Sequence, residues 1–162
     1  MPGLEDLYRE IILDHYRTPR NRGELEPPAV KIDGHNPLCG DEITVYLAVD
    51  RAESGDVDDA VVSDIKIGGQ GCSISQSSAS MMTKAVMGKT VGDINAVMRR
   101  FKSMMGIDGI ELEDDDGDVD LGELEALQGV VKFPVRIKCA VLSWNTLANA
   151  IAASADNASD DA

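Results

Sequence analysis

Three cysteines and one aspartate are the residues of this chain whose types could do chemistry together. Cys39 lies in the stretch Asn-Pro-Leu-Cys-Gly-Asp, Cys72 follows Gly-Gly-Gln-Gly, and Cys139 follows Pro-Val-Arg-Ile-Lys. Asp41 stands two residues after Cys39, so a turn can bring both side chains to the same point. Three thiolates and one carboxylate form a tetrahedral ligand set that suits zinc, and thiolates also hold iron–sulfur clusters.

The spacing of the cysteines leaves two interpretations open. An odd number of distant cysteines argues against a disulfide framework, a CxxC redox pair and a zinc ribbon. Cys72 and Cys139 are predicted at or near helix starts, where the helix dipole and free N–H groups favour a thiolate. Arg136 and Lys138 would offset part of the negative charge of a shared site. The residues alone are therefore compatible with a shared metal–thiolate site and with three unrelated buried thiols.

Two alternating segments predict the strands that must position these residues. Apolar and polar residues alternate over 42–50 and 60–68, and the polar turn between them makes the pair an antiparallel hairpin. A shorter strand is expected over 29–33, and His15 is expected to cap or pack the first helix. Helical periodicity predicts helices over residues 3–16, 73–87, 90–105 and 121–127, and a last helix from about Lys138. Strands and helices do not alternate as βαβ units, so the fold class is α+β.

The chain is short and strongly acidic. Its 162 residues include 15 Lys and Arg against 29 Asp and Glu, and the net charge of −14 disfavours nucleic acid and anionic lipid as partners. Apolar runs stay below the roughly 20 residues of a membrane helix, and no signal-peptide layout opens the chain, so we expect a cytoplasmic protein without membrane contact. The excess of Asp also predicts a halophilic, high-salt cytosol. We expect a single domain over residues 1–155 and a disordered tail over 156–162.

Three separated blocks of this chain resemble the signature blocks of the SufU family, which belongs to the IscU/NifU-like group of iron–sulfur cluster assembly proteins. The blocks span residues 39–41, 71–75 and 136–140, with Trp144 following the third. Further similar stretches extend the likeness over nearly the whole chain, up to about Ile151. Three blocks in the right order are hard to obtain by chance, so the resemblance is specific.

The resemblance implies a fold, a metal and a set of partners. The implied fold is a small antiparallel β-sheet packed against several helices, as in SufE and NifU/IscU. Cys39, Asp41, Cys72 and Cys139 are implied as ligands of Zn²⁺, and Cys39 as the thiol that accepts sulfur from a SufS-type cysteine desulfurase. Arg136 is implied in docking and in the ligand exchange that frees this thiol. The sulfur would pass to a SufB/SufC/SufD-type scaffold complex.

Two other functions remain as alternatives at this point. One is an IscU-type scaffold that binds iron and builds a transient [2Fe–2S] cluster on the same four ligands. The other is a non-catalytic adaptor with structural zinc. IscU-like chains carry a histidine where this chain has Lys138, and an LPPVK stretch where it has Phe133-Pro134-Val135-Arg136. Residues 104–130 also resemble the insertion that marks SufU. These departures favour the sulfurtransferase.

Overall fold

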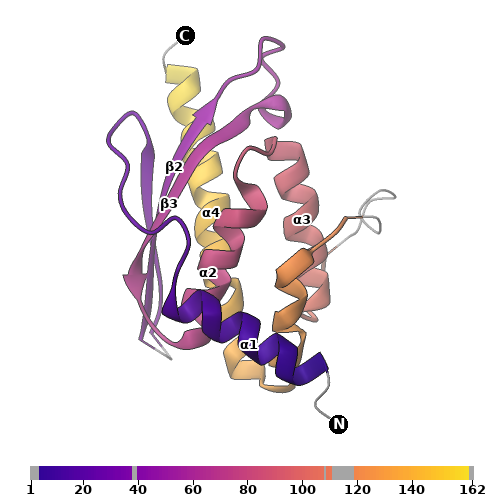
Figure 1. The fold of residues 1–162 in the computed structure, drawn as a ribbon. Helices are drawn as coiled ribbons and strands as arrows, with labels where there is room; N and C mark the ends of the chain where they lie inside the picture. Colours follow the sequence, from indigo (N-terminus) through magenta and orange to yellow (C-terminus); the bar gives the residue numbers. More distant parts are fainter. Residues whose placement is uncertain (1–3, 38–39, 108, 111–118, 161–162) are drawn as a thin grey trace.

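The computed structural model describes residues 4–37, 40–107, 109–110 and 119–160 of the chain. A three-stranded sheet lies on one side of the molecule, and helices cover one of its faces (Figure 1). The last helix packs directly on the first two strands and on the helix that follows the third strand. This arrangement confirms the predicted α+β class.

The sheet consists of three antiparallel strands in the order β1-β2-β3. Their bounds are β1 Val30–Asn36, β2 Asp41–Asp50 and β3 Val61–Gln70. Val45 in the middle of β2 faces Ile32 on one side and Ile67 on the other, and it is fully buried. The predicted hairpin of β2 and β3 is confirmed. The predicted strand over 29–33 is also present, but it runs on to Asn36 because it pairs with β2 as far as Asp41.

Four α-helices and two 3₁₀ helices complete the part of the chain that the structure describes. Their bounds are α1 Leu4–Arg17, η1 Val57–Asp59, α2 Ser73–Val86, α3 Val91–Met104, η3 Gly122–Lys132 and α4 Pro134–Asp160. The core is centred on Trp144 of α4, which is fully buried and stacks on Phe101 of α3 with ring centroids 5.0 Å apart. A stacked pair of rings stabilises the fold beyond the contribution of the apolar area that each ring buries, so this contact holds α3 against α4. The boundary predicted at residue 155 stays a prediction.

Two predicted helices differ from the structure. The last helix begins at Pro134 rather than near Lys138, because proline is favoured in the first turn, where its missing N–H is not needed. Cys139 therefore lies in the second turn of α4 and not at its start. The helix predicted over 121–127 is a 3₁₀ helix, closed at its end by the bond from the Phe133 N–H to the Val130 carbonyl.

Within the described residues, no helix has both the length and the apolar character that crossing a membrane requires.

Candidate metal centre

Asp41 occupies a position fixed by the β1–β2 pairing. It is the first residue of β2 and lies opposite Asn36, the last residue of β1, so residues 37–40 form the connection between the strands. Asp41 is fully buried. A carboxylate in such a place must be bonded or bound to a cation, because burial without a partner is costly.

Cys72 reaches Asp41 from the other side, through the start of α2. Cys72 is the N-cap of this helix, and its sulfur accepts a bond from the Ser75 N–H at 3.5 Å. The Cys72 N–H donates to Asp41 Oδ1 at 2.8 Å, and its Sγ lies 3.9 Å from Asp41 Oδ2. The predicted position at a helix start is confirmed for this thiol.

Gly71 explains how the backbone before Cys72 can approach Asp41 so closely. A Cβ atom at this position would lie 2.5 Å from Asp41 Oδ1 and 2.7 Å from Ser75 Oγ. Both distances are shorter than real Cβ contacts, so a side chain there would push the Cys72 N–H off the carboxylate.

Cys139 completes the described part of the group from α4. It is fully buried, and its sulfur accepts a bond from the Asn36 side-chain amide at 3.7 Å. In Figure 1 the end of β3 and the starts of α2 and α4 lie together at the lower end of the molecule. Two thiols and a carboxylate from three elements therefore meet at one place.

The donor set fits a tetrahedral metal ion. The ligand atoms of Asp41, Cys72 and Cys139 all lie within 4.8 Å of one another. Zn–S bonds of about 2.3 Å and Zn–O bonds of about 2.0 Å require ligand atoms roughly 3.5–3.8 Å apart. The separation of 3.9 Å between Cys72 Sγ and Asp41 Oδ2 is close to that value. Two soft sulfurs with one oxygen are typical of zinc and of iron–sulfur sites.

The surroundings keep the carboxylate charged. Burial works to raise the pKa of Asp41, but bonds from the Cys72 N–H and from the side chains of Cys139, Ser75 and Cys72 outweigh it, so the pKa lies below its ordinary value. An ionised carboxylate is the form that binds a metal.

Of the remaining predicted site residues, the structure describes Arg136, Lys138 and His35. Cys39 falls outside the described residues, directly before Gly40 in the chain. Arg136 is exposed on the first turn of α4, three residues before Cys139, and Lys138 is exposed as well. His35 is exposed on β1 and paired with Glu42 of β2.

Sequence reasoning missed the side chains that support the ligands. Asn36 bonds the sulfur of Cys139, and the hydroxyl of Ser75 donates to the Cys72 carbonyl at 3.1 Å. Ser75 could have been found as the third residue of a helix that Cys72 caps, a position with a known capping role. The Asn36 contact depends on α4 crossing β1, which local sequence does not reveal.

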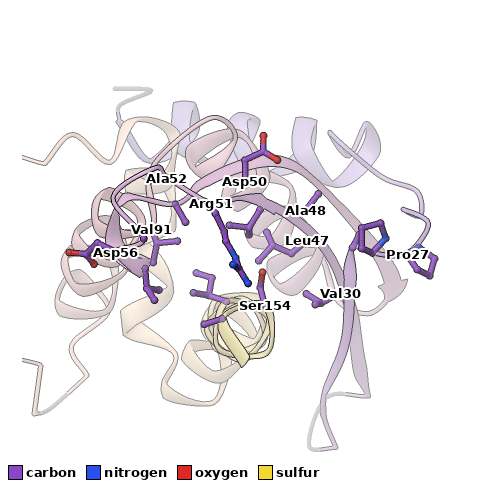
Figure 2. Close-up of a pocket in the computed structure, with 18 residues that line it drawn as sticks. Pro27, Val30, Leu47, Ala48, Asp50, Arg51, Ala52, Asp56, Val91 and Ser154 are labelled. Atoms are coloured by element: carbon purple, nitrogen blue, oxygen red, sulfur yellow. The ribbon is translucent and has the colours of Figure 1, made fainter. Parts of the chain in front are cut away.

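A cavity of about 770 Å³ lies elsewhere, at the opposite end of β2. Figure 2 shows its lining from the sheet, from the β2–β3 connection and from α4, with Arg51 extending towards Ser154. Asp41 and Asp50 stand at opposite ends of the strand, so the metal-ligating group is not in this cavity. A group at the end of a sheet suits a reaction with a docked protein better than one with an enclosed small molecule.

Known proteins share this sequence and architecture. The family model described as the NifU-like N-terminal domain matches residues 7–140. The chain is 47% identical over 150 residues to the zinc-dependent sulfurtransferase SufU of Bacillus subtilis, covering 93% of this chain and 92% of that protein. It is 38% identical over 154 residues to the iron–sulfur cluster assembly scaffold protein IscU of Streptococcus pyogenes, covering 94% and 87%.

A solved structure extends the similarity to three dimensions. The crystal structure of a candidate iron–sulfur cluster assembly scaffold protein for the SUF system, from Fervidobacterium islandicum, aligns with a TM-score of 0.72 at 33% identity. The alignment covers 92% of this chain and 99% of that one.

Proposed function

This chain belongs to the family of the NifU-like N-terminal domain, and from that premise we propose that it is a zinc-dependent sulfurtransferase of the SufU type. It accepts sulfur from a SufS-type cysteine desulfurase and passes it to a SufB/SufC/SufD-type scaffold complex in the cytoplasm. The observation that carries the proposal is the convergence of Asp41, Cys72 and Cys139 at distances that suit a tetrahedral metal.

Four residues would hold the zinc. Three are the converging ligands, and Cys39 is the fourth, because only one residue separates it from Asp41 in the chain and two residues span at most about 7 Å. Bound zinc would keep the thiols in the thiolate form at neutral pH. Arg136 and Lys138 at the start of α4 would offset part of the negative charge.

Cys39 is the thiol best suited to accept sulfur. Cys139 is fully buried and bonded to Asn36, so an incoming persulfide would not reach it. Cys72 caps α2, and its sulfur is engaged with the Ser75 N–H. Cys39 belongs to a connection whose described members, Pro37 and Gly40, are exposed.

The transfer is a thiol exchange without net oxidation. The Cys39 thiolate attacks the terminal sulfur of the donor cysteine persulfide. A new S–S bond forms at Cys39, the S–S bond of the donor breaks, and the electron pair of that bond leaves on the donor sulfur as a thiolate. The proton of the terminal sulfur stays with it, so the products are a Cys39 persulfide and the free donor thiolate.

The start of α4 offers a docking surface for the desulfurase. Phe133 is 61% exposed and Val135 is 59% exposed, although both are large apolar residues. Arg136 lies beside them, exposed, and Cys139 follows one turn later. Exposed apolar side chains next to a charged rim are typical of protein interfaces. Arg136 would therefore contribute to docking next to the metal centre.

Metal analysis and sulfur labelling test the proposal. Protein purified without oxygen should contain about one zinc per chain and show no visible absorption band. After incubation with a cysteine desulfurase and cysteine, mass spectrometry of Cys39 peptides should show one added sulfur atom. Cys39→Ala should abolish the labelling, whereas His35→Ala, an exposed change on the adjoining strand, should leave it intact.

Each alternative has its own signature in these measurements. Iron with acid-labile sulfide and visible charge-transfer bands would overturn the sulfurtransferase in favour of a scaffold. Bound zinc without any sulfur on Cys39 would overturn it in favour of a structural adaptor.

A further inference from the structure

The glycine loop, residues 68–71, ends β3 and leads into Cys72, and three of its four residues are glycine. Gly69 has a φ of +107°, and a Cβ atom there would lie 2.0 Å from the carbonyl oxygen of Glu42. A Cβ atom on Gly71 would lie 2.5 Å from Asp41 Oδ1. These glycines permit the approach that places the Cys72 N–H on the carboxylate. Residues 68–70 pair with β2, but Gly71 lies beyond the paired residues and its backbone is flexible, so contacts from outside the sheet help to fix the step from β3 into Cys72.

Arg22 donates hydrogen bonds on both sides of Cys72, to the glycine loop before it and to α2 after it. One guanidinium nitrogen donates to the carbonyl of Gly69, three residues before Cys72. Another donates to the side-chain oxygen of Gln76, four residues after it, at 3.4 Å. A planar guanidinium can bond two acceptors at once, whereas an ammonium group cannot do so with the same geometry. Arg22 thus joins the glycine loop to the first turn of α2.

The backbone around Arg22 is itself fixed. Residues 21–23 run alongside β3, with the Ile67 N–H donating to the Asn21 carbonyl at 2.9 Å and the Gly23 N–H donating to the Ile67 carbonyl at 3.0 Å. The Asn21 amide also donates to the hydroxyl of Thr83 on α2 at 3.0 Å. Arg22 is therefore held between the sheet and the helix that it bridges.

A chain of hydrogen bonds leads from Arg22 to the ligands. Gln76 is buried and donates through its amide nitrogen to the hydroxyl of Ser75 at 3.4 Å. Ser75 in turn contacts Cys72 twice, through its N–H to the sulfur and through its hydroxyl to the carbonyl. The exposed guanidinium is connected in this way to the cysteine that caps α2.

From this geometry we infer that Arg22 is a positioning residue of the metal centre. It holds the glycine loop and Cys72 in the conformation that binds metal and so slows release of the ion. The inference rests on the proposed function, since it takes the group of Asp41, Cys72 and Cys139 as a zinc site. Arg22 lies in the stretch that follows α1, which also contains Arg20. Arg20, its neighbour in that stretch, is instead paired with Asp14 at 2.5 Å.

The test compares Arg22→Gln with Arg17→Gln, which removes the same charge from an exposed position on the last turn of α1. Zinc transfer to a coloured chelator should be about five- to ten-fold faster for Arg22→Gln than for the wild type, as expected for a lost hydrogen bond from a charged donor that is partly screened by water. Arg17→Gln should match the wild type. Arg22→Lys should restore only part of the effect, because lysine keeps the charge and loses the fork.

Amide hydrogen exchange in the metal-free protein gives a readout that does not depend on zinc. Arg22→Gln should speed exchange of the Cys72 N–H and leave the Val45 N–H in the middle of the sheet unchanged. Faster exchange of both amides would mean general destabilisation and would overturn a positioning role. Equal zinc release and equal Cys72 exchange in Arg22→Gln and Arg17→Gln would overturn it as well. If the wild type binds no zinc, the proposed function fails, while the exchange experiment still decides whether Arg22 fixes the loop.

Discussion

Two buried polar clusters lie along α2, and they differ in how much negative charge their members can gather at one point. The first is the metal-ligating group at the N-terminus of the helix. The second surrounds His15 of α1, which is fully buried against the middle of the helix. The ring of His15 contacts the Ser80 hydroxyl at 2.7 Å and a carboxylate oxygen of Glu123 at 3.2 Å. Lys84 pairs with the other oxygen of Glu123 at 2.5 Å.

The His15 cluster balances its donors and acceptors. Glu123 accepts from the Nε2–H of the neutral ring, and Ser80 can donate to Nδ1 while it accepts from the Arg20 N–H at 2.8 Å. A cluster satisfied in this way joins α1, α2 and η3 and needs no ligand.

The metal-ligating group has a hydrogen-bond donor for each of its three members, but its charges are not balanced. Its members are a carboxylate and two sulfurs, all within 4.8 Å, and each is an anion when it is deprotonated. Such groups repel one another unless a cation lies between them. The difference teaches that a buried polar cluster indicates a cation site when several groups that can carry negative charge gather at one point, even where each of them also accepts a hydrogen bond.

Removal of a ligand should have the largest effect and should separate the two clusters. Cys139→Ser keeps the size of the side chain but replaces a soft thiolate with a hydroxyl, which is a poor zinc ligand at neutral pH. We expect zinc affinity to fall by at least about 10³-fold, measured by competition with a chromophoric chelator. An affinity within tenfold of the wild type would show that Cys139 is not a ligand.

Removal of His15 should affect stability and leave the metal in place. His15→Ala leaves a cavity and unpairs Ser80 and Glu123, so we expect a loss of about 2–4 kcal/mol in the free energy of unfolding. His35→Ala, at an exposed position, should change it by less than about 0.5 kcal/mol. Denaturant titrations measure both values, and zinc content should remain that of the wild type. Loss of zinc from folded His15→Ala would join the two clusters functionally and remove the contrast.

A change in the glycine loop should have a smaller, local effect. Gly71→Ala places a methyl group 2.5 Å from Asp41 Oδ1, so the ligands must move apart. We expect zinc affinity to fall by about tenfold, as for other changes to the support of metal ligands. Gly129→Ala, where the new methyl group meets open space, is the matched control and should bind zinc like the wild type. Equal affinities for the two variants would show that the close approach of loop and carboxylate does not matter for binding.

The smallest expected effect is a pH dependence that belongs to His15. Burial holds the pKa of His15 below its ordinary value of 6.5, against the opposing bond to Glu123. As the pH falls through 6.5 the unfolded chain therefore takes up a proton before the folded protein does, and stability is lost down to the lower folded pKa. The slope from one such group is at most about 1.4 kcal/mol per pH unit.

Denaturant titrations of metal-free protein between pH 7.5 and pH 5 measure this slope. His15→Gln should reduce it, because glutamine does not titrate. An unchanged slope in His15→Gln would assign the loss of stability to other groups.

Local sequence was sufficient for most of the fold. The alternation of apolar and polar residues along much of β2 and β3 marks a hairpin, and the Thr90 side chain caps α3 by accepting from the Asp93 N–H, as a capping residue does. The sequence places the start of α4 too late because the apolar residues there are exposed: Phe133, which caps the end of η3, and Val135 in the first turn of α4 do not face the core. Helical periodicity is visible only where one face is buried.

The chemistry of the site could likewise be read from residue types. Three cysteines, two of them next to a glycine, and one nearby aspartate indicate a metal–thiolate site or separate thiols, because donor atoms and turn residues are local properties. The residue types do not give the distances between the donor atoms. Asp41, Cys72 and Cys139 come from β2, α2 and α4, and only the packing of these elements brings their ligand atoms within 4.8 Å. The bonds from Arg22 to the glycine loop and from Asn36 to Cys139 arise in the same way, since each joins segments more than 40 residues apart. Such contacts depend on the sum of all the packing interactions in the core, and no local pattern records that sum.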